Sequence, residues 1–327
     1  MKLLLELSLE CESLARAEAV AAATVLGSKT ESVHMEPGVL ILDTDADPAE
    51  LANRLGLCHH VDEWLSTCRS DELDACAKDL DVEGPIRIRS TKIGEMRIDL
   101  SAATRRIGAI MGREKGVDLS SPKSDIRVVY SESSHVGRAV ASIERAAFEK
   151  RKNRYMPFVY PASLHPKFAR ALVNLTMTRV GGRLLDPFSG TGAILAEASM
   201  LRLHAIGSDF SERMISGSRK NLAHLGQMAE LHLCDVGEVP REIGGVDGIA
   251  TDPPYGRSTS TDGEGLPQLY ERAFEAFSKV LGKGSRVAIV VPELDLVNDL
   301  DDFRITSTHK LWVHRSLTRN FCVLEKA

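Results

Sequence analysis

The stretch Arg183-Leu184-Leu185-Asp186-Pro187-Phe188-Ser189-Gly190-Thr191-Gly192-Ala193-Ile194-Leu195 decides the fold class of this 327-residue chain. Its apolar start, which ends at Asp186, predicts a short buried strand, and the alanine-rich run after Gly192 predicts a helix. Glycines at 190 and 192 let the backbone approach a ligand closely, and the first turn of the helix offers unpaired N–H groups. A strand, a glycine-rich turn and a helix in this order are typical of the ligand-binding edge of a parallel α/β sheet.

The glycine-rich turn could bind a dinucleotide or another ligand, and its residues favour the second reading. The dinucleotide fingerprint has a third glycine where this chain has Leu195, and it lies against a pyrophosphate. Asp186, at the opening of the turn, would repel phosphate. A carboxylate at this point suits a cationic ligand, such as S-adenosylmethionine with its sulfonium and amino groups.

Three further strand-like segments lead into an aspartate. Residues 204–209 end at Asp209, where a ribose diol would be bound, and residues 231–235 end at Asp235, which suits an adenine amino group. The third segment leads into Asp252. Aspartates often occupy surface turns after strands, and for Asp235 alone that reading is as good as a functional one. Four strands in order with the same ending favour ligand binding along one edge of the sheet.

The segment Asp252-Pro253-Pro254-Tyr255 predicts a binding seat for a flat ring that carries an exposed amine. Two adjacent prolines stiffen the backbone and remove two N–H donors, so the carbonyls around them become acceptors. Asp252 and the Pro253 carbonyl could accept the two N–H bonds of an amine, and Tyr255 could stack on the ring. A proline-stiffened turn without function is the simpler reading. The three preceding aspartates argue against it.

Asp186 to Gly192, Asp209, Asp235 and Asp252 to Tyr255, in this order, resemble the motifs of S-adenosylmethionine-dependent methyltransferases that act on exocyclic amines of nucleobases. The longer string from Thr251 to Thr259 resembles the archaeal tRNA (guanine-10-N2)-methyltransferases, including the dimethylating enzymes. The segment from Tyr160 to Lys167 resembles the part that this family places before its cofactor loop. The resemblance is specific over residues 155–260 and weaker in the first fifty.

The resemblance implies a site for S-adenosylmethionine and a site for the target base. Catalytic residues would be Asp252, Pro253 and Tyr255, with Pro254 and Arg257 beside the RNA. The residues expected to contact the cofactor are Pro161, Ser163, Asp186, Phe188, Gly190, Gly192, Asp209 and Asp235. The implied activity is methylation of the N2 amine of a guanosine in tRNA, most naturally guanosine 10, with one or two methyl groups added.

The amino-terminal part is expected to bind RNA. Residues 116–128 and Gly137 resemble the closing part of a THUMP domain, which this family carries. The net charge of −5 is unevenly distributed: residues 84–154 hold 16 Lys and Arg against 8 Asp and Glu. Clustered cations of this kind favour a phosphate backbone, although a solvated basic face is the simpler alternative. The cations expected to contact RNA are Arg87, Arg89, Lys92, Arg105, Arg106, Lys152 and Arg154.

The expected architecture is α/β with two parts. An amino-terminal α+β subdomain would span residues 1–55, a THUMP domain 56–145, a basic linker 146–162 and the methyltransferase domain 163–327. Helices near 164–177 and 267–281 alternate with the strands already named, which predicts a Rossmann-like, mostly parallel sheet. The family's sheet has seven strands with the last antiparallel, and two closing strands near 303–311 and 316–324 fit this arrangement. Residues 258–265 predict a loop.

Several alternatives remain open on the sequence. An adenine-N6 methyltransferase of DNA or RNA uses the same Asp-Pro-Pro-Tyr chemistry. A glutamine-N5 methyltransferase usually has Asn in place of Asp252. A non-catalytic tRNA-binding protein could retain the fold, although the four intact aspartates argue against it.

Composition sets the remaining expectations. The six cysteines form no C-x-x-C pair, which argues against a zinc ribbon or a disulfide framework and favours a reducing cytoplasm. His59 and His60 lie near Cys58 and Cys68, but adjacent histidines on a helix point apart, so no metal is expected. No apolar run reaches membrane-spanning length. The expected partner is tRNA, with no DNA and no membrane, and some relatives use a small zinc-binding activator subunit.

Overall fold

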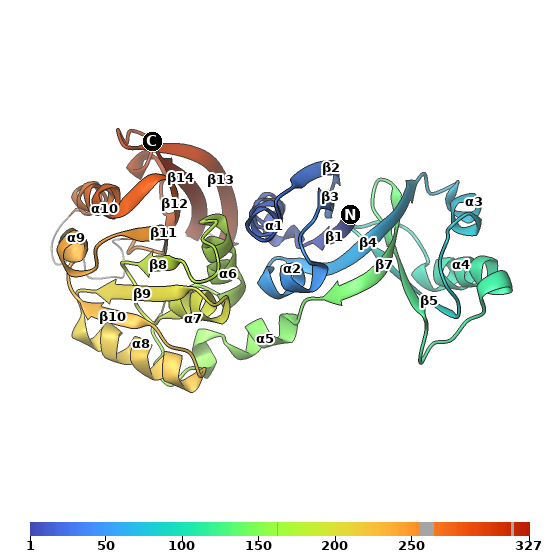
Figure 1. Cartoon of the computed structure of the whole chain (residues 1–327), viewed down its shortest axis with the longest axis horizontal. Helices are drawn as coiled ribbons and strands as arrows, with labels where there is room; N and C mark the ends of the chain where they lie inside the picture. Colours follow the sequence, from blue (N-terminus) through green and yellow to red (C-terminus); the bar gives the residue numbers. More distant parts are fainter. Residues whose placement is uncertain (162, 256–264, 315–316) are drawn as a thin grey trace. The chain divides into compact units, whose positions relative to one another are not determined.

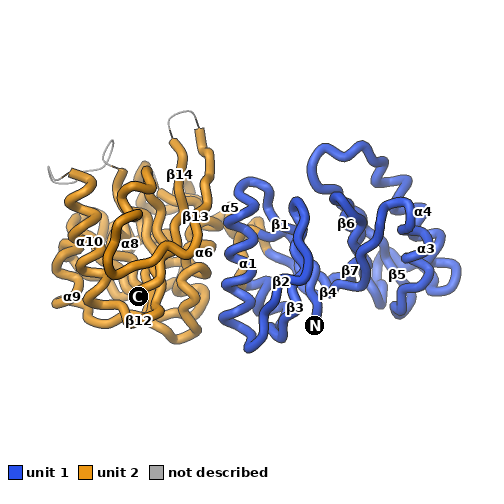
Figure 2. The backbone as a smooth tube through the Cα atoms, turned by 90° about the horizontal axis from the view of Figure 1, so that it is seen from above, with its two compact units in different colours: residues 1–53, 58–143 blue, residues 54–57, 144–327 orange. Residues whose placement is uncertain are grey.

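The computed structural model describes residues 1–161, 163–255, 265–314 and 317–327. The chain forms two compact units, and each is described by itself (Figure 2). Unit 1 comprises Met1–Asn53 and Cys58–Ile143, and unit 2 comprises Arg54–Leu57 and Glu144–Ala327. The predicted division at residues 55, 145 and 162 stays a prediction.

Unit 2 contains a seven-stranded sheet in the order β10-β9-β8-β11-β12-β14-β13 (Figure 1). Neighbouring strands from β10 to β12 are parallel, and β14 is antiparallel to both β12 and β13. This confirms the predicted mostly parallel sheet. The strands are β8 (Arg183–Asp186), β9 (His204–Asp209), β10 (Glu230–Leu233), β11 (Val246–Thr251), β12 (Leu281–Val291), β13 (Phe303–His314) and β14 (Leu317–Lys326).

Helices cover both faces of this sheet. Phe321 and Cys322 are neighbours on β14 and therefore point to opposite faces. The Phe321 ring lies 5.7 Å from Phe168 of α6 (Pro166–Leu175), whereas Cys322 belongs to the apolar cluster that contains Phe274 and Phe277 of α10 (Leu266–Val280). α7 (Ala193–Met200) contacts both α6 and α8 (Glu212–His224), and α9 (Val239–Glu242) contacts α10. The parallel strands are therefore buried on both sides.

The segment expected to be a linker packs closely on unit 2. It forms α5 (Arg145–Lys150) and a short 3₁₀ turn, and it belongs to unit 2. Glu197 of α7 is 1% exposed and accepts hydrogen bonds from Arg151 at 2.8 Å and from Arg170 at 2.9 Å. Because two guanidinium groups share one buried carboxylate, Arg151 is part of the fold of unit 2 and is not free to reach RNA.

Unit 1 also contains a seven-stranded sheet, in the order β2-β3-β1-β4-β7-β6-β5. Its strands are β1 (Lys2–Leu7), β2 (Thr30–Glu36), β3 (Val39–Thr44), β4 (Cys58–Cys68), β5 (Ile86–Lys92), β6 (Ser124–Tyr130) and β7 (Ser134–Ser142). Its helices are α1 (Glu12–Leu26), α2 (Pro48–Arg54), α3 (Leu73–Lys78) and α4 (Leu100–Lys115).

One local prediction in unit 1 was wrong. His59 and His60 lie on strand β4 and not on a helix. The strand forms because β4 pairs with β1 on one side and with β7 on the other. Tertiary strand pairing therefore overrides the polar composition of this segment.

Replacement of Glu197 by Gln should destabilise unit 2 by about 3–5 kcal/mol, since it removes the charge of the buried carboxylate that Arg151 and Arg170 share. Thermal or denaturant unfolding would measure the change. The control is Glu230→Gln, which removes a half-exposed carboxylate beside His204 and His232. Equal stability of the two variants would contradict a structural role for the Glu197 cluster.

Candidate functional site

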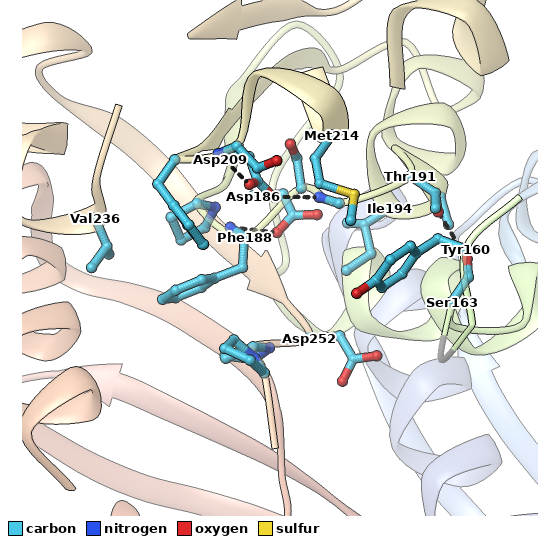
Figure 3. Close-up of a pocket in the computed structure, with 18 of the residues that line it drawn as sticks. Tyr160, Ser163, Asp186, Phe188, Thr191, Ile194, Asp209, Met214, Val236 and Asp252 are labelled. Carbon is cyan, nitrogen blue, oxygen red and sulfur yellow. Dashed lines mark hydrogen bonds between the residues drawn. The ribbon is translucent and has the colours of Figure 1, made fainter. Parts of the chain in front are cut away.

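A cavity of about 870 Å³ opens at the carboxyl ends of β8, β9 and β11 (Figure 3). All of its lining residues belong to unit 2. The predicted residues that line it are Pro161, Ser163, Asp186, Phe188, Gly190, Asp209, Asp235, Asp252, Pro253, Pro254 and Tyr255. The carboxyl edge of a parallel sheet is where ligands of this architecture bind.

Asp186 ends β8 at the base of the cavity and is 2% exposed. Its carboxylate accepts hydrogen bonds from the Thr251 hydroxyl at 2.7 Å and from the Phe188 backbone N–H at 3.3 Å. Burial raises the pKa of Asp186 to about 7, and these hydrogen bonds oppose the rise. A cationic ligand in the cavity would favour the ionised form further.

The turn after Asp186 needs its glycines. Gly190 and Gly192 have φ values of +48° and +82°, in the region that L side chains rarely adopt. A Cβ on Gly192 would also meet the Ser218 hydroxyl at 2.3 Å. Gly192 is the N-cap of α7 and does not line the cavity, so its predicted role is indirect: it shapes the turn that does.

Asp209 ends β9 and fixes this turn. One carboxylate oxygen accepts from Gly190 N at 3.0 Å, and the other accepts from Ser211 N at 2.9 Å. Burial raises the pKa of Asp209. Next to it, Phe210 lines the cavity with 49% of its surface exposed, so its ring is accessible to a ligand. Sequence reasoning missed Phe210, although its position directly after the strand-ending aspartate was a usable signal.

Asp235 carries an ion pair that the sequence did not predict. Arg272 of α10 contacts its carboxylate, and Gly237 N donates to it at 2.9 Å. Burial acts to raise the pKa of Asp235, but the hydrogen bonds from Arg272 and Gly237 and the charge of Arg272 together outweigh burial and leave the pKa lowered. Arg272 also lines the cavity, so a ligand that reaches Asp235 meets a guanidinium beside it.

Asp252 and Tyr255 form the opposite wall. The Tyr255 hydroxyl donates a hydrogen bond of 2.5 Å to Asp252, while Pro253 is buried between them. Burial raises the pKa of Asp252 to about 6, and the positive charge of Arg319 opposes the rise. Burial also raises the pKa of Tyr255. An acceptor carboxylate, a rigid proline backbone and an aromatic ring thus share one wall.

The segment before α6 closes the cavity on a further side. Ser163 and Thr191 are joined by a hydroxyl–hydroxyl hydrogen bond of 2.8 Å, which ties this segment to the glycine-rich turn (Figure 3). The Arg213 guanidinium lies 5.8 Å from the Phe158 ring and 6.0 Å from the Tyr160 ring. Further lining residues that the sequence analysis missed are Tyr160, Ile194, Arg213, Met214 and Val236.

None of the described basic residues expected to contact RNA is among the residues that line this cavity. Five of these residues are on unit 1. There, Arg87 and Arg89 both form ion pairs with Asp125, and Arg106 forms an ion pair with Asp74 at 3.1 Å. Lys92 donates a hydrogen bond to the Met96 carbonyl at 2.7 Å, and Arg105 is exposed on α4. In unit 2, Lys152 pairs with Glu149, and the Arg154 guanidinium lies 4.7 Å from the Tyr155 ring. Arg257 and residues 258–264 lie outside the described residues. Contact between RNA and any of the basic residues named in this paragraph stays a prediction.

Among the described residues, one group of potential metal ligands lies close together: His34, Glu36 and His135 of unit 1. Glu36 accepts hydrogen bonds from His135 and from Ser133 N. The other His135 nitrogen bonds the Thr67 hydroxyl at 2.9 Å. A hydrogen-bonded network accounts for this proximity without an ion. No helix in the described part of the chain is long and apolar enough to cross a membrane.

Comparison with known proteins assigns the chain to a protein family. Residues 153–320 match the model of the RMKL-like methyltransferase domain. The tRNA (guanine(10)-N2)-dimethyltransferase of Methanothermobacter thermautotrophicus is 36% identical over 285 residues, which cover 84% of each protein. The chain belongs to this methyltransferase family. The enzyme of the same name from Pyrococcus abyssi is 31% identical over 89% of this chain and 90% of that protein.

The fold of this methyltransferase also matches a solved structure. TrmN from Thermus thermophilus superposes with a TM-score of 0.58 at 25% identity, and the match covers 100% of both chains. The resemblance drawn from the sequence motifs is thereby confirmed, as is the expected enzyme class.

Asp209→Ala should weaken S-adenosylmethionine binding at least tenfold, since a hydrogen bond to a charged group contributes about 1.5–3 kcal/mol. Calorimetry would measure the affinity. Glu212→Gln, an exposed neighbour outside the cavity lining, is the control and should bind normally. Unchanged affinity in Asp209→Ala would remove this residue from the cofactor site.

Proposed function

We propose that this methyltransferase acts on the exocyclic N2 amine of a guanosine in tRNA, with guanosine 10 as the target and S-adenosylmethionine as the methyl donor. The proposal is supported by the family membership and by the names of its relatives. The observation that carries it is the sharing of one cavity by Asp186, Asp209 and Asp252. A cavity of this composition can hold a cationic donor and an aromatic amine together.

The residues present fit S-adenosylmethionine. The buried Asp186 carboxylate offers a negative group to its cationic part, and the open backbone at Gly190 leaves room for close approach. Asp209 would hold the ribose, and Phe210 offers an exposed ring for the adenine. When bound, the donor supplies an electrophilic methyl group on a positively charged sulfur.

The wall of the cavity that Asp252, Pro253 and Tyr255 form, called the acceptor wall from here on, can activate the amine for methyl transfer. The lone pair of the guanine N2 amine is delocalised into the ring and is a poor nucleophile. Asp252 accepting one N–H bond and the Pro253 carbonyl accepting the other would localise that lone pair and aim it. Positive charge develops on nitrogen during transfer, so the carboxylate stabilises the transition state more than the ground state.

Tyr255 would hold the base by stacking. Its hydroxyl is bound to Asp252 at the edge of the ring, which leaves the ring faces for a base. Base–aromatic stacking contributes about 1–3 kcal/mol in proteins that bind single-stranded nucleic acid. The guanine must leave its stack to reach the cavity.

The amino-terminal unit is the proposed tRNA-binding part, with a THUMP-type domain over residues 56–145. This proposal rests on the charge of residues 84–154 and on the exposed cations of α4. We also propose a cytoplasmic location, because tRNA is the substrate. A zinc-binding activator subunit remains a prediction, and full activity of the purified chain alone would contradict a requirement for it.

Asp252→Asn should lower kcat at least about 100-fold, because the amide cannot stabilise developing positive charge as a carboxylate does. Its affinity for S-adenosylmethionine should stay within about twofold of wild type, since the lost contact is to the acceptor. Single-turnover assays and calorimetry would measure the two quantities. A variant with near-normal turnover would remove Asp252 from catalysis.

The pH profile gives an independent check. The pKa of Asp252 is raised to about 6, so the group loses its proton as pH rises through this value. Only the carboxylate accepts an N–H bond on both oxygens. With saturating cofactor, kcat should therefore fall about tenfold per pH unit below this pKa and level off above it. A kcat that stays constant as the pH falls below this pKa would show that ionisation of Asp252 does not limit the rate.

Arg105→Ala combined with Arg106→Ala should reduce tRNA affinity and flatten its salt dependence, since each lost phosphate contact lowers the slope of log K against log salt by about 1. Binding titrations at several salt concentrations would measure the slope. An unchanged slope would exclude α4 from the tRNA interface.

A further inference from the structure

Strand β14 brings a cation to the edge of the sheet where the acceptor wall lies. It is antiparallel to β12, with Asn320 opposite Val291 and Phe321 opposite Val290. β11 is parallel to β12 on the other side, with Thr251 opposite Ile289. The start of β14 therefore lies at the same edge as the end of β11 (Figure 1).

Arg319 points to the face of the sheet that is covered by α6. It lies two residues before Phe321 on β14, so the two side chains share a face, and Phe321 contacts Phe168 of α6. Asp252 follows Thr251 and is aligned with the row that contains Val290 and Phe321. Register thus directs the Arg319 side chain toward the wall formed by Asp252 and Tyr255.

Arg319 is also an exception to the burial pattern of its strand. It is 8% exposed, although arginine is rarely buried without a specific partner. Positions 321 and 323 on the same face of β14 are apolar and buried, so packing alone would favour an apolar residue at 319. A residue that breaks the local pattern and interacts with a side chain that lines the cavity points to function.

Within the described part of the chain, few charged groups interact with Asp252. Arg319 is the cation that opposes the effect of burial on the pKa of Asp252, and its guanidinium also hydrogen-bonds the Tyr255 hydroxyl. Among the described residues, the other titratable groups that interact with Asp252 are Asp186 of β8, Tyr255 itself and Tyr270 of α10. Of these groups, Arg319 is the one that carries positive charge.

We propose that Arg319 is a positioning residue for methyl transfer, whose guanidinium keeps the Asp252 carboxylate ionised and holds the Tyr255 hydroxyl against it. The inference rests on the proposed function. Arginine suits the task because its planar group stays charged at all relevant pH values and donates several N–H bonds at fixed angles. Arg319 would act through Asp252 and Tyr255 without touching the donor.

The test compares Arg319→Gln, which removes the charge, with Arg319→Lys, which keeps it. Arg319→Gln should move the low-pH fall of kcat (the acid limb) upward by about one pH unit, since the lost cation raises the pKa of Asp252, and should therefore lower kcat about tenfold at about pH 5 and about twofold at about pH 7. Arg319→Lys should keep the acid limb near its wild-type position. Calorimetry should give both variants an unchanged affinity for S-adenosylmethionine.

The matched control is Arg304→Gln, which removes an exposed arginine of the adjacent strand β13 that pairs with Glu325 at 3.5 Å. It should leave kcat and the acid limb unchanged. A wild-type acid limb in Arg319→Gln, with or without a loss of thermal stability, would overturn the inference. The proposed function fails separately, if the wild-type chain transfers no methyl group to tRNA.

Discussion

The hydrogen bond from the Thr251 hydroxyl to Asp186 joins the two strands on which the site is built. β8 and β11 are adjacent and parallel, so their carboxyl ends lie side by side. Asp186 opens the glycine-rich turn, and Asp252 directly follows Thr251. A single buried contact therefore sets the donor side and the acceptor side of the cavity next to each other. Without it, the buried Asp186 carboxylate would keep only the longer hydrogen bond from the Phe188 N–H, and burial of a poorly paired carboxylate costs free energy.

The cavity concentrates negative charge, and this makes it selective. Burial raises the pKa of both Asp186 and Asp252, and the Asp252 carboxylate adds to the rise at Asp186. A cationic ligand relieves that cost, whereas a phosphate would add to it. The same arrangement stabilises positive charge as it develops on an amine. The negative charge of the cavity therefore favours both binding of the cationic donor and transfer of the methyl group.

The sequence predicted the elements of this site well because its signals are local. Strand-ending aspartates and glycine-rich turns depend on neighbouring residues, and the structure has β8, β9 and β11 end where the motifs require. What the sequence could not predict are pairings between distant segments. Arg272 lies 37 residues from Asp235, and Arg319 meets the acceptor wall only through the register of three strands.

Pairings between distant segments also decide the structure outside the cavity. The charged segment after Glu144 has the composition of a linker, but Arg151 packs on Glu197 of α7 and so joins unit 2. His59 lies on a strand because β4 has a partner on each side. Local composition carries no information about such partners.

The most direct measurement is incubation of the purified chain with labelled S-adenosylmethionine and an unmodified tRNA transcript, followed by nuclease mapping and mass spectrometry of the nucleosides. The account predicts label on the N2 amine of guanosine 10, as the monomethyl or dimethyl form. Label on adenine N6, or tRNA that stays unlabelled while the donor is bound, would contradict it.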